Sequence, residues 1–295
     1  MTNLYTHQDS NVAKTWLLMA VFLAVVVGIG YFISVYYNSP EILVIAVVFS
    51  LVMNVMSYYN SDKIVLKMYG AHQITRESHR TLWNTVENLA ITAGLPMPKV
   101  FLIPDDAPNA FATGRDKEHA VVAVTTGLLA MMDQNELEGV VAHELAHIGN
   151  RDILLMSVVV VLVGFVSLLA DFFLRRMFFG GRDSDSRGGG VLALVGVVLV
   201  VLSPIFVSMI QLAVSRKREF LADASAGLLT RYPEGLASAL EKISTDTEVL
   251  EVANEATAHM YISNPLVKNL NASRVANLFN THPPIAERIS RLRSM

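Results

Sequence analysis

The chain contains no cysteine and few charged residues, and both shortages exclude classes of protein. Without cysteine no disulfide can form, and any metal site must use nitrogen and oxygen ligands. Only 17% of the 295 residues are charged, whereas soluble globular chains usually have about a quarter. The net charge of −3 gives no basic surface of the kind that binds nucleic acid. The absence of cysteine also fits a globular part that faces the cytoplasm.

The hydrophobic residues, 53% of the chain, gather in long runs, which indicates a membrane protein. Residues 16–36 and 42–59 are almost continuously apolar, and each is long enough to cross a bilayer. A cleaved signal peptide is the alternative for the first run, but the run is too long and no small-residue cleavage site follows. Lys14 precedes this hairpin, and Lys63 and Lys67 follow it. The positive-inside rule therefore places both ends in the cytoplasm.

A second pair of apolar runs, residues 153–170 and 191–214, is harder to place. Two crossings would put four arginines of the connecting loop on the outer side, against the positive-inside tendency. A re-entrant pair, or helices that lie against the first hairpin, are the alternatives. We favour two crossings; with zero or two crossings the chain returns to the side that it left.

The stretch between the two apolar pairs predicts a small α+β unit. The apolar spacing over residues 69–93 predicts a helix, which ends at a glycine. Short runs at 100–103, 110–113 and 120–124 predict strands, the last two as a hairpin. The third strand leads into a short helix and then into a longer one.

The longer helix contains the sequence His143-Glu144-Leu145-Ala146-His147 and begins at a capping box formed by Asp133 and Glu136. Residues four apart on a helix lie about 40° apart around its axis, so both imidazoles can reach one ion. Glu144 lies to the side of the pair, near the ion without having to bind it. This is the arrangement of two zinc ligands and a general base. Such a sequence also arises by chance, with both histidines on a helix surface.

A further pair of carboxylates, Glu219 and Asp223, is spaced to lie on one face of a helix. Glu219 can supply the third zinc ligand. Asp223 can accept a hydrogen bond from the outer nitrogen of a ligating histidine and so fix its tautomer. The alternative is that both are solvated partners of Arg216 or Lys217.

Taken together, these motifs resemble the HtpX family of bacterial membrane-bound zinc metalloproteases, gluzincins related to the CAAX prenyl endoproteases. The resemblance extends over nearly the whole chain. It covers the N-terminal hairpin, residues 108–112, the H-E-x-x-H sequence, the long apolar insertion, the carboxylate pair and residues 281–284. It implies one zinc ion per chain, held by His143, His147 and Glu219, with Glu144 as the base.

The resemblance implies an enzyme of the bacterial inner membrane that crosses it several times, with its active site facing the cytoplasm. Its substrates would be proteins or peptides, membrane proteins among them, in quality control and the response to stress. The expected fold is a mostly α-helical membrane protein with an α+β zincin-like catalytic domain that contains a small sheet. The expected divisions are a transmembrane hairpin, a first catalytic part, a second apolar pair and a second catalytic part, at residues 1–60, 61–152, 153–214 and 215–295.

The resemblance also implies two residues that handle the substrate. Asn109 corresponds to a contact with the substrate main chain, and His282 to a group near the reacting carbonyl. The strand that follows Asn109, with Ala110 and Phe111, would be a sheet edge on which an extended peptide lies. A plain edge strand, and a packing role for His282 at the start of a helix, are the alternatives.

Three rival functions follow from the same residues. One is a membrane scaffold or chaperone-like subunit with a structural or silent metal site, although such a site has no use for the base Glu144. Another is a metal transporter, which would need ionisable groups inside the apolar runs, where almost none occur. The third is the processing of prenylated peptides, which would need a chamber large enough for a lipid.

Overall fold

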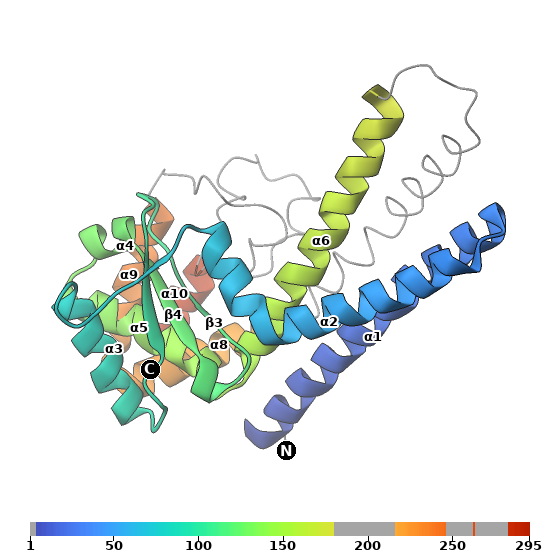
Figure 1. Cartoon of the computed structure of the whole chain (residues 1–295). Coiled ribbons are helices and arrows are strands. Elements are labelled where there is room, and N and C mark those ends of the chain that lie inside the picture. Colours follow the sequence, from blue (N-terminus) through green and yellow to red (C-terminus); the bar gives the residue numbers. More distant parts are fainter. Residues whose placement is uncertain (1–3, 180–215, 246–261, 263–282) are drawn as a thin grey trace.

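The computed structural model describes residues 4–179, 216–245, 262 and 283–295. His282, the second apolar run at 191–214 and most of the loop before it lie outside the described residues. Figure 1 shows two long helices beside a compact α+β part, with a third long helix that leaves this part in another direction.

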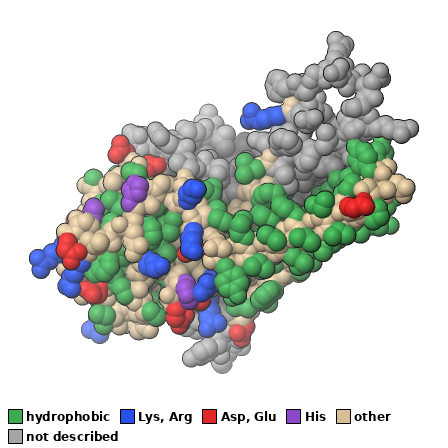
Figure 2. Space-filling model, in the orientation of Figure 1, with side chains coloured by type: hydrophobic (Ala, Val, Ile, Leu, Met, Phe, Trp, Pro, Cys, Tyr) green, Lys and Arg blue, Asp and Glu red, His purple; other side chains and the backbone are tan. Residues whose placement is uncertain are grey.

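The two long helices form the expected hairpin. Helix α1 (Leu4–Tyr37) turns through Asn38, which has a positive φ of 51°, into α2 (Pro40–Met68). Both are long and apolar enough to cross a membrane, with mean hydropathy of 2.5 and 2.1. Many of their large apolar side chains are exposed, as Figure 2 shows along this part of the surface. The helices approach closely where Gly30 meets Ala46, because a Cβ atom on Gly30 would lie only 2.2 Å from that of Ala46.

The third long helix, α6 (Asp152–Phe179), packs its first half against the hairpin. Its buried side chains meet those of α1 and α2 in one apolar cluster. With the preceding helix it forms a pair bent by 87°, so the described residues contain two candidate membrane spans, or three if the bent pair counts as one. Of the expected second apolar pair, the structure describes the first run, within α6, and the run at 191–214 lies outside the described residues.

The compact part contains a four-stranded sheet of order β1-β2-β4-β3. Strands β3 (Ala110–Thr113) and β4 (Val121–Thr125) form the predicted antiparallel hairpin. Strand β2 (Lys99–Ile103) pairs with β4 in parallel, and the short β1 (His72–Gln73) adds to β2. Within the described part of the chain, β3 is an edge strand.

The expected helix over residues 69–93 is wrong at its beginning. The helix α3 (Arg80–Thr92) starts much later, and β1 and a loop precede it. Ile74 is the reason, because its N–H donates to the carbonyl of Val100 at 3.0 Å and its side chain is buried beside the sheet. Ile74 is apolar because it packs against the sheet, and it does not form part of one face of a helix.

Both faces of the sheet are covered. Helix α5 (Gln134–Gly149) follows the short α4 (Thr126–Met131) and packs with α3 against one face. The end of α2 and one turn of α6 cover the other face, where Phe111 and Val121 are buried. A hydrogen bond of 2.7 Å between the hydroxyls of Thr113 and Ser157 also joins β3 to α6. The membrane helices therefore form part of the core, and α2 runs through residue 60, the expected division, without a break.

Three further helices complete the layer around α5, namely α8 (Arg216–Thr230), α9 (Pro233–Thr245) and α10 (Ile285–Arg293). Helix α9 can approach α5 closely because each of the two helices has a glycine at the contact, Gly139 in α5 and Gly235 in α9. A Cβ atom on Gly139 would lie 2.6 Å from the nitrogen of Leu236, and one on Gly235 would lie 2.5 Å from the carbonyl oxygen of Asn135. Most of α5 is thus covered, and its two histidines are buried.

Candidate metal centre

The start of α5 is fixed by the predicted capping box. Asp133 accepts a hydrogen bond from the backbone N–H of Glu136 at 3.0 Å, and Glu136 accepts one from the N–H of Asp133 at 2.9 Å. Glu136 is itself buried and also pairs with Lys242 of α9 at 2.6 Å. The cap therefore fixes the rotation of α5 relative to α9, and with it the direction of the two histidines.

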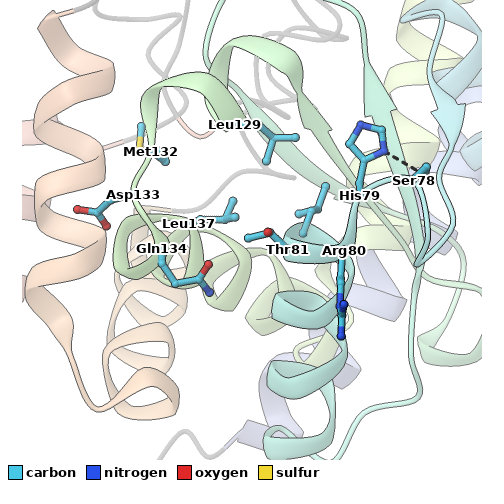
Figure 3. A pocket seen from close by; sticks show the side chains of 10 residues that line it. Ser78, His79, Arg80, Thr81, Leu129, Met132, Asp133, Gln134 and Leu137 are labelled. Atoms are coloured by element: carbon cyan, nitrogen blue, oxygen red, sulfur yellow. Dashed lines mark hydrogen bonds between the residues drawn. The ribbon is translucent and has the colours of Figure 1, made fainter.

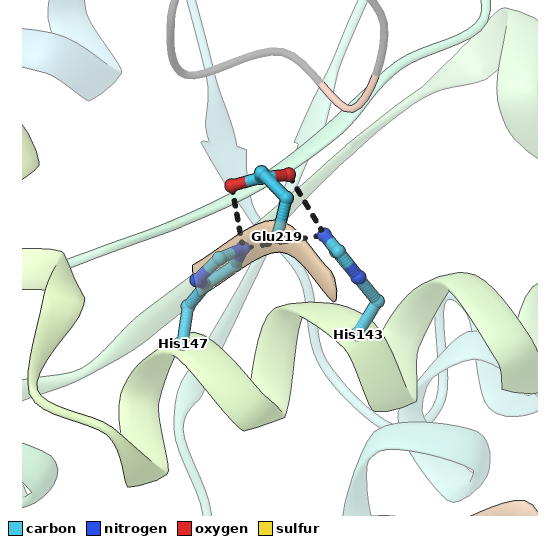
Figure 4. A group of neighbouring side chains, drawn as sticks. All are labelled: His143, His147 and Glu219. Atoms are coloured by element: carbon cyan, nitrogen blue, oxygen red, sulfur yellow. Dashed lines mark hydrogen bonds and ion pairs between the residues drawn. The ribbon is translucent and has the colours of Figure 1, made fainter. Parts of the chain in front are cut away.

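The structure brings His143, His147 and Glu219 together. The two Nε2 atoms lie 3.2 Å apart, and each lies 3.7 Å from one oxygen of Glu219, as Figure 4 shows. Two ligands of a tetrahedral zinc ion, at bond lengths of about 2.0–2.1 Å, are separated by about 3.3 Å. The three side chains are only 2%, 6% and 2% exposed. Their donor atoms therefore fit a single ion of this kind.

Each imidazole has a carboxylate at its other nitrogen. Nδ1 of His143 lies 3.0 Å from Asp223, as the sequence predicts for one of the histidines. Nδ1 of His147 lies 3.0 Å from Asp152, the first residue of α6, which the sequence analysis did not identify. A proton held on each Nδ1 leaves both Nε2 atoms free to bind a metal.

Behind each carboxylate lies a buried guanidinium. Arg288 of α10 binds both oxygens of Asp223, at 2.9 and 2.7 Å, and donates to the carbonyl of Ile262 at 2.8 Å. Arg218 of α8 binds Asp152 at 3.2 Å. Burial by itself would raise the pKa of Asp223, but Arg288 and the neighbouring His143 hold it below its usual value. These contacts exclude the alternative in which Asp223 is a solvated partner of Arg216 or Lys217.

Carboxylates outnumber guanidiniums around the histidines. Among the described residues, four carboxylates and two guanidiniums are buried here, namely Glu144, Asp152, Glu219, Asp223, Arg218 and Arg288. Since uncompensated buried charge is costly, this excess of carboxylates favours a cation among them, whether protons on the imidazoles or a metal ion.

The two imidazoles respond differently to this environment. Burial lowers the pKa of His143, so that the neutral, metal-binding form is favoured. Burial acts in the same direction on His147, but the hydrogen bond with Asp152 and the charge of Glu219 raise its pKa to about 9. A carboxylate that raises the basicity of an imidazole also makes it a stronger ligand.

Glu144 is buried beside the histidines and touches the edge strand. Burial raises its pKa to about 7, and the charge of Glu219 acts in the same direction, while the charge of His147 and a hydrogen bond from the backbone of Ala112 oppose both. A carboxylate that titrates near neutral pH can take up a proton and release it again, which is the requirement for a general base.

The predicted substrate residues lie along β3, with their side chains turned away from solvent. Ala110 packs in the cluster on the α5 face of the sheet, and Phe111 packs on the opposite face beside Tyr69. The side-chain oxygen of Asn109 accepts a hydrogen bond from the N–H of Ile262 at 3.3 Å. Ala110 and Phe111 are only 0% and 1% exposed as whole residues, main chain included.

A separate pocket lies between the beginnings of α3 and α5 and does not include the histidines. Its volume is about 400 Å³, and Figure 3 shows His79, Arg80 and Gln134 among the side chains around it. None of the predicted site residues lines this pocket, so it has no part in the centre described above.

One family model matches most of this chain, and several known proteins match nearly all of it. The family model described as peptidase family M48 matches residues 76–295. A protease HtpX homolog of Thermoanaerobacter pseudethanolicus is 45% identical over 99% of this chain and 98% of its own length. That of Caldanaerobacter subterraneus subsp. tengcongensis is 46% identical over the same shares. That of Pyrococcus furiosus is 44% identical over 96% and 95%.

The fold is similar to that in the crystal structure of S. mikatae Ste24p. The TM-score is 0.52 with 21% sequence identity, over 95% of this chain and 67% of that chain. At this identity the likeness concerns the fold alone, and it agrees with the expected combination of membrane helices and a small sheet.

The buried pair of Arg288 and Asp223 gives a first prediction. Arg288→Met should lower the free energy of unfolding by about 3–5 kcal/mol, because it leaves a buried carboxylate without its partner. Arg76→Met removes an arginine that is exposed and paired with Glu87 at 3.8 Å, and it should cost at most about 1 kcal/mol. Denaturant unfolding of both variants in detergent, followed by circular dichroism, measures the difference. Equal losses in the two variants would contradict the prediction.

Proposed function

Because the chain belongs to peptidase family M48 and is a membrane metalloprotease, we propose that it is a zinc-dependent endopeptidase of a bacterial cytoplasmic membrane that degrades unstable membrane proteins. The observation that carries the proposal is the convergence of three buried donor atoms, with a carboxylate behind each imidazole. The names of the relatives, which are proteases, support the same activity.

In this proposal His143, His147 and Glu219 hold the zinc ion. When bound, such an ion polarises a carbonyl group and lowers the pKa of water toward about 7. Donors of nitrogen and oxygen in a site without cysteine suit zinc, and the separation of the donor atoms agrees with its bond lengths. Asp152 and Asp223 keep the two imidazoles in the tautomer that leaves Nε2 free.

Glu144 acts as the general base. It takes the proton of the attacking water and later passes it to the nitrogen of the departing amine. Burial raises the pKa of this carboxylate, which makes it a stronger proton acceptor. His282, which lies outside the described residues, is proposed to stabilise the oxygen that becomes negative on the reacting carbonyl.

An extended substrate is proposed to lie along β3, where main-chain hydrogen bonds give affinity with little dependence on sequence. The bond between Asn109 and Ile262 supports this role, because it shows that the amide oxygen of Asn109 can accept from a main-chain N–H. Hydrolysis with low sequence preference suits an enzyme of quality control and stress, whose substrates share instability rather than a motif.

The base assignment predicts that Glu144→Gln abolishes proteolysis while the zinc content of the protein is unchanged. The measurement is digestion of casein and of an unfolded membrane protein in proteoliposomes, with metal analysis of the same samples. Glu138→Gln, a partly exposed residue of the same helix, should cleave as the wild type does. Cleavage by Glu144→Gln at the wild-type rate would refute the assignment, and a wild type inactive on both substrates would favour the silent scaffold.

The ligand assignment predicts that Glu219→Ala lowers the zinc content. The variant removes one of three protein ligands and should bind zinc at least about tenfold more weakly, by analogy with the losses that follow removal of groups around a metal. Metal analysis after dialysis against a weak chelator measures this. Glu241→Ala, which removes an exposed carboxylate, is the control. A zinc content equal to that of the control would remove Glu219 from the site.

The proposed orientation can be tested because the chain has no cysteine of its own. Glu41→Cys places a single thiol at the turn between α1 and α2, and Glu118→Cys places one in the loop before β4, both at exposed positions. A maleimide that does not cross the membrane should label Glu41→Cys in intact cells and Glu118→Cys only after permeabilisation. The reverse pattern would contradict a cytoplasmic active site.

A further inference from the structure

The first membrane helix reaches the neighbourhood of the metal centre, and its residue Asn11 contacts the groups there directly. This side chain is 3% exposed. Its Nδ2 donates to Asp152 at 2.6 Å and to the carbonyl of Asn150 at 3.4 Å. A helix that served only as an anchor would not need a buried amide here. The contact with Asp152 is therefore the feature to explain.

The amide of Asn11 is engaged at both ends. While Nδ2 donates to Asp152, Oδ1 accepts from Nη1 of Arg218 at 3.1 Å. Arg218 also donates to the same oxygen of Asp152, at 3.2 Å. The three buried side chains thus form a closed ring from α1, α6 and α8, and only a residue that both donates and accepts can close it.

This ring supports one imidazole directly. The second oxygen of Asp152 lies 3.0 Å from Nδ1 of His147, and Arg218 comes just before Glu219 in the chain. If Asn11 were lost, Asp152 would lose a donor and Arg218 an acceptor, and the pair could turn toward each other. The carboxylate oxygen that faces His147 would then lose its fixed direction.

We propose that Asn11 is a positioning residue of the metal centre, through which the first membrane helix fixes the orientation of His147. The inference rests on the proposed role of His147 as a metal ligand. The apolar cluster of α1, α2 and α6 supports it, since α1 is packed firmly against the helix that carries Asp152. The metal centre is then complete only with α1 in place.

The test uses the full-length protein in detergent micelles and measures zinc affinity by competition with a chelator. Asn11→Ala should bind zinc about tenfold more weakly, at the lower end of the range for groups that orient metal ligands. Asn54→Ala is the matched control, because Asn54 is a buried amide on α2 that donates to the carbonyl of Met19 at 3.2 Å, away from the metal centre. Its zinc affinity should equal that of the wild type.

A double-mutant cycle separates positioning from a loss of packing. Asp152→Asn should weaken zinc binding by about 10- to 100-fold, and Asn11→Ala should add little to it, because both act through the same carboxylate. Additive losses, or equal losses in Asn11→Ala and Asn54→Ala, would overturn the inference. The absorption spectrum of the cobalt-substituted protein should shift in Asn11→Ala and not in Asn54→Ala.

A second variant guards against misfolding. Asn11→Leu fills the space of the side chain but removes both its donor and its acceptor and adds no charge, so it should also bind zinc more weakly. Wild-type affinity in a folded Asn11→Leu would contradict the inference. If His147→Ala and Asp152→Asn both keep wild-type affinity, the ligand assignment fails. If Asp152→Asn binds weakly and Asn11→Ala does not, the inference about α1 alone fails.

Discussion

The buried charged groups around α5 are paired, and these pairs fix how the neighbouring helices meet it. The two histidines are supported in the same way: His143 by Asp223 and Arg288, and His147 by Asp152 and Arg218. Each carboxylate is fixed from behind by a guanidinium, since a buried carboxylate without such a partner would be strongly destabilising. The other side of each imidazole, its Nε2 atom, faces Glu219, where the three donor atoms lie close enough together to hold one ion.

This arrangement requires segments that are far apart in the chain. The bend of 87° after α5 is the clearest example. Arg151 has a positive φ of 58°, and this single residue turns the chain so that Asp152, five residues after His147, returns to its imidazole. In a continuous helix the two side chains would lie on different faces. The bend thus directs α6 toward the hairpin and supplies the partner of a proposed ligand in one step.

The sequence predicts what is local and fails where a tertiary contact decides. The capping box at Asp133, the β3–β4 hairpin and the membrane hairpin are confirmed, because each has a signal within a few residues or one long run. The start of α3 is wrong, because the contact of Ile74 with the sheet overrides its helical spacing. Arg288 and Asp152 could not be identified, since the partner of each becomes visible only when helices from distant parts of the chain meet. The structure brings the predicted ligands together. Their roles, and that of Glu144, stay predictions.

The membrane part and the proteolytic part share one core. The end of α2 and the beginning of α6 cover one face of the sheet, and Phe111, in the edge strand beside the proposed base, packs against Tyr69 directly after α2. A fragment without the hairpin would expose this apolar face to water and would leave the ring of Asp152 and Arg218 without its amide. The hairpin therefore does more than hold a soluble enzyme at the bilayer. Burial of the sheet and orientation of an imidazole both depend on it, so a change in the packing of the membrane helices has a direct physical route to the metal centre.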